Sequence, residues 1–339
     1  MMFTLLATGC GKEEDKNKEA IYNGTLVFTY GDHYVTKGEV YIYLQTIGER
    51  YESQYGEAVW ETTISVEGSE EVISMEEAVK EEVVEEIVKV KTLVAQADNF
   101  KVKLTEAEEA KLEEEAKEFY NGLTDADISK MEIDEETILK VLTESEIAAR
   151  VEEQLLIDNP IEISDEEARM TTFYDMYFHC YTIDENGVIT PFTEEEKKIQ
   201  YENALSACST LATATIDENQ DAENIAKLAE YYKLEEAQEY TISPDEIIET
   251  YGQDVYDLLY SMEPGDYSGV METEYGYHVF QMIALTDHKA TQARKETMTQ
   301  EAVSAQLAEN LAAWQKKIDS DFSYPESIDM DVYDTIKIN

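Results

Sequence analysis

The clearest pattern along the chain is the recurrence of apolar residues every three or four positions, which is typical of helices that bury one face. In the segment 74–97 this face consists of Val79, Val83, Ile87, Val90 and Val94. A predicted strand and turn at 25–35 precede a similar face, made of Val40, Leu44, Ile47 and Tyr51. Because two or three further helices are expected within 105–157, the N-terminal part is predicted to be mainly helical.

The pattern changes at 158–164, where "DNPIEIS" interrupts the helical spacing and indicates a domain boundary. A strand is predicted at 174–183, with the turn "DENG" after it. Helices should follow at 193–213, at 221–232 and from Pro244 to about Tyr260. Two strands close the segment, one within "EPGDYSGVM" and one within "TEYGYHVFQM", residues 273–282. This order of elements predicts a small α+β domain.

The last of these strands carries a histidine. Since side chains alternate along a strand, one face holds Gly276, His278, Phe280 and Met282, and the other holds Tyr275, Tyr277, Val279 and Gln281. On this stretch alone, the pattern favours a histidine that is satisfied within a core over a functional one.

A final helix is predicted from about 291 to 319, with an apolar seam formed by Val303, Leu307, Leu311, Trp314 and Ile318. The seam is too long for the edge of a small sheet, so we expect it to pack on the N-terminal helices. The predicted fold class is therefore α+β: a mostly helical domain, made of the N-terminal helices and a returning C-terminal helix, with a small α+β domain inserted. The predicted ranges are 1–19 for a tether, 20–163, 164–290 and 291–339.

Helix starts are marked by Ser/Thr-x-x-Glu, the capping box, in which each side chain binds a free backbone N–H group of the first turn. The pattern occurs at Thr36–Glu39, Ser74–Glu77, Thr105–Glu108, Thr143–Glu146, Ser164–Glu167, Thr193–Glu196 and Ser243–Glu246. Pro244, at the first helical position, strengthens the last of these. In a chain so rich in glutamate, agreement with the apolar spacing separates real boxes from chance.

The composition of the chain limits the classes of ligand that it is expected to bind. The chain has 339 residues, with 26 Lys+Arg against 76 Asp+Glu, for a net charge of −50 at pH 7. Such an acidic surface repels phosphate backbones, so nucleic acid is not an expected partner. A hydrophobic content of 43% still supports a packed core. The sequence shows neither calcium-loop spacing nor a His-Cys-Asp cluster with ligand spacing, so no metal site is predicted.

The first ten residues, "MMFTLLATGC", raise a question of processing. A short apolar run ends in small residues and Cys10, and a polar segment follows. This resembles the lipobox of bacterial lipoproteins, which implies lipidation of Cys10 and a membrane anchor. Ala7 stands where Leu is commoner, and no basic segment precedes the apolar run. The alternative is a free cysteine in a cytosolic protein. No other apolar run approaches the roughly 20 residues that span a bilayer.

Two further cysteines are predicted to be small core residues. Cys180 lies in the predicted strand, and Cys208 lies on the apolar stripe of the helix at 193–213. A disulfide between them is compatible with an extracellular location and stays open.

The second domain resembles a known family. "YFHCYTI" at its start and "SMEPGDYSGVMETEYGYHVFQM" at its end are similar to parvulin-type peptidyl-prolyl isomerase domains. In that family a strand histidine and a histidine in a Gly-Tyr-His strand meet at the centre of the sheet. The resemblance implies that His179 and His278 are the catalytic pair, with rings within hydrogen-bonding range directly or through one water or hydroxyl, and that Cys180 faces the core.

The resemblance also implies a proline pocket, for which no cofactor is required. Rotation about an X–Pro bond has a barrier of about 18–20 kcal/mol, and a site lowers it by binding the twisted amide best. The pocket residues implied are Tyr251, Val255, Phe280 and Met282, with Tyr275 beside Gly276. Tyr251 and Val255 replace the family's Met and Phe, so a roomier pocket is expected. The acidic or thiol neighbour of the family's histidines has no evident counterpart.

Beyond this domain, "TYGDHYVTKGEVYIYL" at 29–44, the helical region after it, the lipobox and the final helix are similar to extracytoplasmic foldase lipoproteins of the PrsA type. The resemblance implies a lipid-anchored foldase on the outer face of the bacterial cell membrane. Its partners would be unfolded or newly secreted proteins with X-Pro bonds, and a homodimer is left open. One alternative is a non-catalytic holdase with a degenerate parvulin domain. Another is a solute-binding lipoprotein, but the chain lacks the βαβ repeats of two large lobes.

Overall fold

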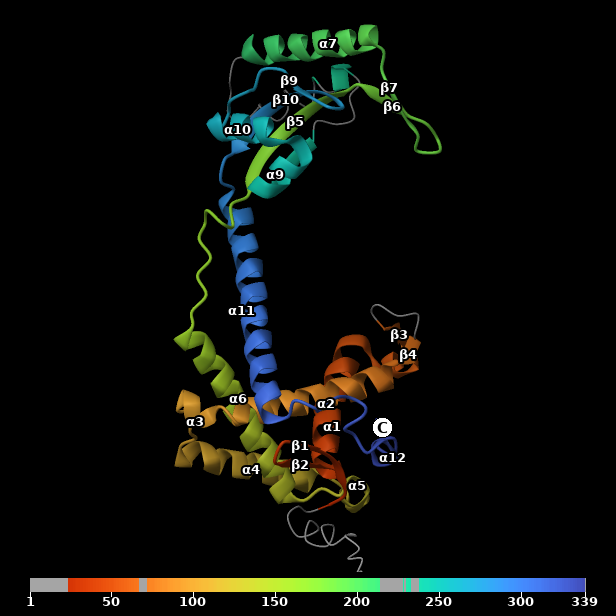
Figure 1. Cartoon of the computed structure of the whole chain (residues 1–339), viewed down its shortest axis with the longest axis vertical. Coiled ribbons are helices and arrows are strands. Elements are labelled where there is room, and N and C mark those ends of the chain that lie inside the picture. The colour runs from red at the N-terminus through yellow and green to blue at the C-terminus, as the bar shows by residue number, and fades with distance from the viewer. Residues whose placement is uncertain (1–23, 67–71, 214–227, 229, 233–237, 339) are drawn as a thin grey trace, which may run out of the picture. The chain divides into compact units, whose positions relative to one another are not determined.

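The computed structural model describes residues 24–66, 72–213, 228, 230–232 and 238–338. The chain forms two compact units, each of which is described by itself (Figure 1). Unit 1 consists of Met1–Pro160 together with Ser304–Asn339, and unit 2 is the intervening segment Ile161–Val303. The ranges proposed from sequence, 1–19, 20–163, 164–290 and 291–339, with the last packing on the N-terminal domain, remain predictions.

Unit 1 is mainly helical. It begins with an antiparallel hairpin of β1 (Leu26–Tyr30) and β2 (His33–Thr36). The elements that follow are α1 (Lys37–Tyr55), η1 (Glu57–Glu61), β3 (Thr63–Ser65), β4 (Val72–Ser74), α2 (Met75–Val94), α3 (Ala97–Phe100), α4 (Glu106–Gly122), α5 (Asp125–Met131) and α6 (Glu135–Asp158). After Ser304 the unit contains the end of α11 (His288–Ile318) and α12 (Met330–Tyr333).

The core of unit 1 is built on the predicted apolar faces. Val79, Val83 and Ile87 of α2 are completely buried. Leu307, Leu311, Trp314 and Ile318 of α11 pack against this core. The Trp314 ring lies 5.8 Å from that of Phe100, in an edge-to-face arrangement that suits aromatic pairs. The seam begins at Leu307 because the residues of α11 up to Val303 belong to unit 2.

A buried ion network replaces one predicted helix cap. Thr36 precedes α1, but its side chain makes no capping hydrogen bond. Glu39 instead points inward, where it pairs with Lys91, which also pairs with Glu144. Lys140 binds the second oxygen of Glu39 at 3.0 Å. Removing one member would leave a buried charge uncompensated, so the network fixes the arrangement of α1, α2 and α6.

Most of the other predicted capping boxes form, and one does not. Ser74, Thr105, Thr193 and Ser243 form reciprocal bonds with the glutamate three residues later. Ser164 and Glu167 form the same bonds around a turn. Thr143 lies inside α6, where no helix starts.

Unit 2 has the α+β architecture that the sequence predicted. Its elements are β5 (Thr171–His179), β6 (Tyr181–Ile183), β7 (Ile189–Pro191), α7 (Glu194–Thr213), β8 (Gln238–Ile242), α9 (Pro244–Tyr251), α10 (Gln253–Ser261), β9 (Met271–Thr273), β10 (Gly276–Ala284) and the start of α11. Four strands form an antiparallel sheet in the order β8-β5-β10-β9. A separate hairpin, β6–β7, extends from the end of β5 (Figure 1).

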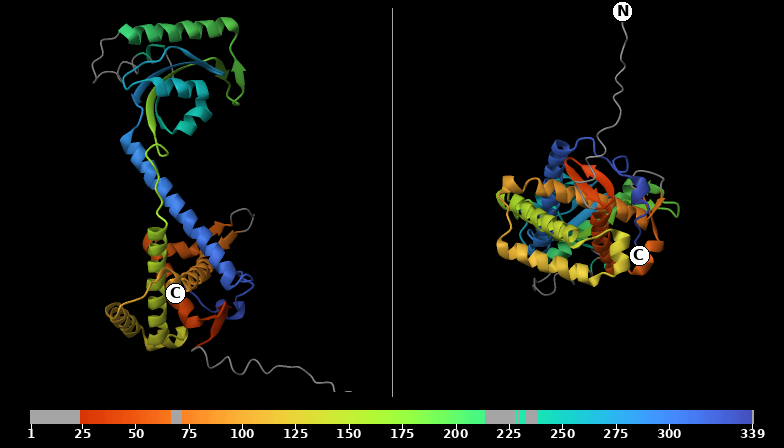
Figure 2. Two further views of the ribbon diagram at one scale, coloured as in Figure 1. Left: turned by 60° about the vertical axis from the view of Figure 1, so that its left-hand side comes forward. Right: turned by 90° about the horizontal axis from the view of Figure 1, so that it is seen from below.

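Helices cover both faces of this sheet (Figure 2). On one face, Phe173, Phe280 and Met282 pack against α9 and α10. On the other face, Met176, Phe178 and Val279 pack against α7. The two sets alternate along β5 and β10, as the two-residue period of a strand requires.

Four sequence predictions need correction in unit 2. The single helix from Pro244 breaks into α9 and α10 at Gly252, whose φ of +90° is a glycine conformation. The strand at 174–183 divides at Cys180 into β5 and β6. Strand β8 was not foreseen, because its short polar sequence lacks a strand pattern. The turn in "EPGDYSGVM" leads into a strand that lies slightly later, β9.

The predicted helix at 221–232 falls almost entirely outside the described residues. Cys180 and Cys208 are free thiols, so the disulfide left open by the sequence is not formed. Cys180 is buried, as the alternation predicted.

Candidate functional site

A groove of about 480 Å³ opens on unit 2 at the end of β5. Strand β5 contributes alternate residues to it, β6 forms one side, and β8 forms another. Its walls consist of Asp175, Tyr177, His179, Tyr181, Thr182, Ile183, Gln238 and Tyr240. Of the residues proposed from the sequence, only His179 lines this groove directly.

The register of β5 and β10 explains where the two histidines lie. Gly276 pairs with His179, and His278 pairs with Tyr177. Paired residues share a face, so His179 and His278 are on the same face of adjacent strands, but two residues out of step. The ring of Tyr177 stacks on His278, with a centroid distance of 4.4 Å. No direct hydrogen bond joins the two histidines among the described residues, and an approach through one water or hydroxyl stays a prediction.

Gly276 allows the two strands to meet this closely. A Cβ at this position would lie 2.4 Å from the carbonyl oxygen of Phe178 and 2.8 Å from the Tyr177 ring. Any side chain would push β10 away from β5. The glycine of the Gly-Tyr-His motif thus sets the approach that brings Tyr177 onto His278.

The partner of His278 is Asp175. The His278 Nδ1 atom lies 3.0 Å from both carboxylate oxygens, and both side chains are buried. A carboxylate only accepts hydrogen bonds, so we assign the proton to Nδ1. The other ring nitrogen, Nε2, lies 3.1 Å from Thr273 Oγ1. The ring is therefore held at both nitrogens.

Asp175 was missed in the sequence, although a signal was present. In "YDMYFH", alternation along β5 places Asp175, Tyr177 and His179 on one face. The acidic neighbour that had no evident counterpart is thus four residues before His179. Only the pairing register shows that it meets His278.

Tyrosines surround the carboxylate. The Tyr251 hydroxyl donates to Asp175 Oδ2 at 3.3 Å, and its ring lies edge-on to His278 at 5.6 Å. Burial, and then the charge of Asp175, raise the pKa of Tyr251 well above its usual range, so the phenol remains a donor. Burial and Asp175 also raise the pKa of Tyr240, whose hydroxyl donates to Gln238 at 2.5 Å. Both phenols are therefore neutral donors whose protons are engaged within the site.

His179 has a different environment from His278. Its ring contacts those of Tyr177, Tyr181 and Phe192 at 5.5 to 6.2 Å. Within the described part of the chain, neither ring nitrogen makes a hydrogen bond. His179 is consequently the histidine that is available to a molecule in the groove.

The predicted proline pocket is closed. Phe280 and Met282 have no exposed surface, and Val255 is 1% exposed. These residues form a core cluster with Phe173, and Tyr251 packs edge-on against Phe280 at 5.6 Å. Val255 thus belongs to a packed cluster that also contains the rings of Phe173 and Tyr251. The expected roomier pocket is therefore wrong.

Tyr275 is separate from this cluster. It lies in the turn before β10 and is 53% exposed. Its carbonyl oxygen accepts bonds from the backbone N–H of Cys180 at 2.8 Å and from the Tyr177 hydroxyl at 3.1 Å. The residue supports the Tyr177 ring through its backbone.

Other candidate sites were considered in the same way. Over the described ranges, no three His, Cys, Asp or Glu side chains gather in a way that could hold a metal ion. None of the helices described is both long and apolar enough to cross a membrane. Cys10 lies outside the described residues, so its lipidation stays a prediction.

Comparisons with known proteins agree with the motifs. No family model matches the chain. Foldase protein PrsA of Clostridium acetobutylicum is 24% identical over 295 residues, which cover 85% of this chain and 82% of that protein.

Two solved structures are also similar. Peptidylprolyl isomerase (PrsA) from Bacillus cereus is 14% identical, with coverage of 80% of this chain and 95% of that one and a TM-score of 0.25. A structure from a study of the SurA-like chaperones PEB4 and Cj1289 of Campylobacter jejuni is 10% identical, with coverage of 88% and 98% and a TM-score of 0.27. TM-scores this low carry no argument, so the assignment rests on the sequence relative and the motifs. Similarity along most of both sequences supports a PrsA-type foldase, with a foldase or chaperone function.

Proposed function

We propose that unit 2 catalyses cis–trans isomerisation of X-Pro bonds in secreted proteins, within an extracytoplasmic foldase. The observation that supports this most is the buried Asp175–His278 pair next to an open groove that carries His179. Such a site needs no nucleophile, because isomerisation only requires the twisted amide to be bound better than either planar form.

Each residue has a distinct role in this proposal. His179 donates a hydrogen bond to the carbonyl oxygen of the twisted amide. His278 and Asp175 are positioning residues: Asp175 holds the ring of His278, and that ring supports Tyr177 in the groove by stacking. The rings of Tyr177, Tyr181 and Tyr240 provide apolar surface for the proline ring.

A specific observation favours a second candidate, a holdase that binds extended segments without catalysis. Val255, Phe280 and Met282 are packed into the core, so they offer no open cup for a proline ring. A groove that only binds segments would need no such cup.

The test is a protease-coupled isomerisation assay on a panel of X-Pro peptides, with the full chain. His179→Gln should lower kcat/KM by about three- to tenfold, the worth of one hydrogen bond. His288→Gln is the matched control, because His288 is exposed at the start of α11 and does not line the groove. Equal activity of the two variants would mean that His179 takes no part in catalysis. Absence of activity in the wild type would leave the holdase as the remaining candidate function.

Location and partners complete the proposal. We propose that the chain acts outside the cytoplasm, anchored through a lipid on Cys10, on unfolded or newly secreted proteins. A Cys10→Ser variant should no longer partition with membranes. Unchanged partitioning would mean that Cys10 does not carry the anchor. A homodimer is compatible with these roles, and sedimentation of the full chain would reveal it.

A further inference from the structure

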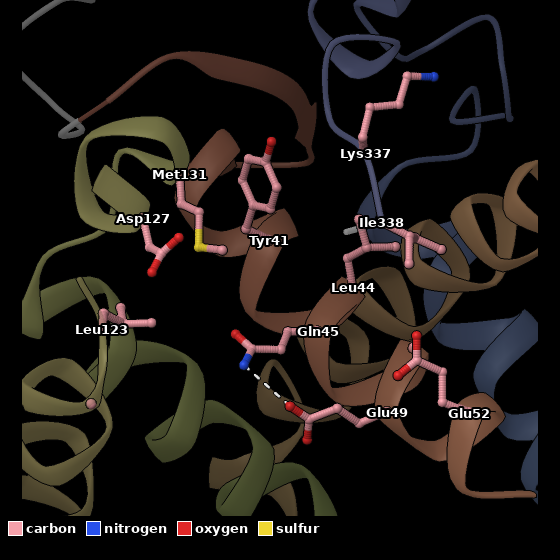
Figure 3. A pocket seen from close by; sticks show the side chains of 12 residues that line it. Tyr41, Leu44, Gln45, Glu49, Glu52, Leu123, Asp127, Met131, Lys337 and Ile338 are labelled. Atoms are coloured by element: carbon pink, nitrogen blue, oxygen red, sulfur yellow. Dashed lines mark hydrogen bonds between the residues drawn. The ribbon is translucent and has the colours of Figure 1, made fainter. Parts of the chain in front are cut away.

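Unit 1 has a pocket of its own, of about 360 Å³ (Figure 3). It lies between α1, the segment joining α4 to α5, and the last residues of the chain. No role in isomerisation accounts for it, because all its residues belong to unit 1.

The floor of this pocket is apolar. Tyr41, Leu44 and Met131 are 3%, 3% and 6% exposed. Leu123 and Ile338 stand on opposite sides of the space above them (Figure 3). A floor of this kind favours an apolar side chain over a polar one, since burial of apolar surface is the main gain on binding.

The rim is acidic. Glu49, Glu52 and Asp127 line the pocket. Glu49 accepts a hydrogen bond from Gln45 at 3.2 Å, and Glu52 accepts one from Trp60 at 2.7 Å. Across the residues that the structure describes, neither glutamate forms a salt bridge with Lys or Arg. Bonds from Thr124 lower the pKa of Asp127, which keeps this third carboxylate ionised.

One cation lines the pocket, but it is directed elsewhere. The Lys337 ammonium lies 3.5 Å from Glu76, and it points away from the three carboxylates (Figure 3). Glu49 and Glu52 therefore present negative charge beside an apolar floor, without a paired Lys or Arg among the described residues. In addition, Gln45 Oε1 has no hydrogen-bond partner within the described chain, so it is a free acceptor for an N–H group.

We propose that this pocket binds an apolar side chain of an unfolded polypeptide whose neighbouring residues are Lys or Arg. The apolar side chain occupies the floor, and the flanking cations lie against Glu49, Glu52 and Asp127. A net charge of −50 attracts cationic segments from a distance, and the rim then selects where they dock. The proposal does not require unit 2 to be an isomerase.

Gly48 offers a way to close the pocket without disturbing the fold. It lies within α1, and a Cβ there would make only ordinary contacts, 3.8 Å from Trp60 and 4.0 Å from Ile338. Replacing a helical glycine also favours the helix, by about 1 kcal/mol for alanine. A Gly48→Leu side chain should therefore occupy the pocket while the helix is retained.

The experiment measures binding of a fluorescein-labelled, proline-free peptide to the full chain by anisotropy. The peptide carries a central Phe with Lys residues on both sides. We expect at least about tenfold weaker binding by Gly48→Leu and by the double variant Glu49→Gln/Glu52→Gln, which corresponds to about 1.4 kcal/mol. The matched control is Glu113→Gln/Glu114→Gln, which removes the same charge from the exposed face of α4 and should bind like the wild type.

Three results would overturn the proposal. One is unchanged binding by Gly48→Leu when its thermal unfolding matches that of the wild type. Another is an equal loss in the Glu113/Glu114 control, which would mean that general charge attraction suffices. The third is loss of binding in His179→Gln, which would place the peptide in the groove of unit 2. Isomerisation of a short X-Pro peptide is measured in parallel. It tests the isomerase activity of unit 2 independently of peptide binding in the pocket of unit 1.

Discussion

A single buried carboxylate organises the candidate site. Asp175 holds the ring of His278 through Nδ1 and receives the hydroxyl of Tyr251. Neither contact is between neighbours in sequence, and both depend on how β5, β10 and α9 come together. The sequence motif identified both histidines, and alternation along β5 could have identified Asp175. The place of Tyr177 beside His278 needed the register, because a shift of one residue exchanges every side chain between faces.

The first prediction concerns Val255. The family resemblance implied a roomier proline pocket, but Val255 is packed in the core with Leu259 and Phe280, which leaves no room for a Val255→Phe side chain. We expect the larger ring to destabilise the chain by about 1–3 kcal/mol through overpacking, with no gain in isomerisation. Urea unfolding and the peptide assay measure the two effects. A variant that is as stable as the wild type and more active would mean that the pocket beside Val255 is open to a proline ring, and would contradict this account.

The second prediction concerns pH. Hydrogen bonds from Arg150, and then from Thr105, lower the pKa of Glu108 from 4.5 to about 2. Because this pKa is lower in the folded state, the pair stabilises fully above about pH 4.5, and the stabilisation is lost as the pH falls towards 2. We expect Glu108→Gln to flatten the pH dependence of the free energy of unfolding in this window. Glu113→Gln, on the same helix, should not, and an equal effect of both would contradict the assignment.

At the scale of elements, the helices were the most predictable part of the chain. Their apolar spacing identified α1, α2, α7 and α11, and the capping boxes at Ser74, Thr105 and Ser243 marked where helices begin. Features that depend on distant partners were not visible. Glu39 fits a capping box by spacing, yet Lys91, far along the chain, draws it into the core. Strand β8 is short and polar, and it is recognised only by its pairing with β5.

The third prediction concerns the break between α9 and α10. Gly252 has φ +90° and ψ 169°, a region that is essentially restricted to glycine. Gly252→Ala should destabilise the chain by about 1–3 kcal/mol, although no atom blocks a Cβ there. Gly122→Ala is the control, because Gly122 ends α4 with equally open surroundings and without a positive φ. Thermal unfolding compares them, and equal midpoints would mean that the break tolerates any residue.

At the scale of the whole molecule, the chain returns to its first unit after completing the second. The sequence indicated this through the apolar seam of the last helix, which packs on the core of unit 1 from Leu307 onward. The position of the second boundary was less predictable, because one continuous helix, α11, includes residues of both units. In unit 2, Thr291 of this helix is buried and accepts a bond from the backbone of Met170 at 3.0 Å.

The central claim is that the groove of unit 2 catalyses rotation about X-Pro bonds. The most direct measurement is NMR exchange spectroscopy of an X-Pro peptide with a substoichiometric amount of the full chain, because it detects catalysis without a coupling protease. The account predicts exchange peaks between the cis and trans forms with wild type and with His288→Gln, and markedly weaker peaks with His179→Gln. Peptide signals that shift and broaden on binding, with no exchange peaks for any X-Pro sequence tested, would contradict catalysis and leave a groove that only binds.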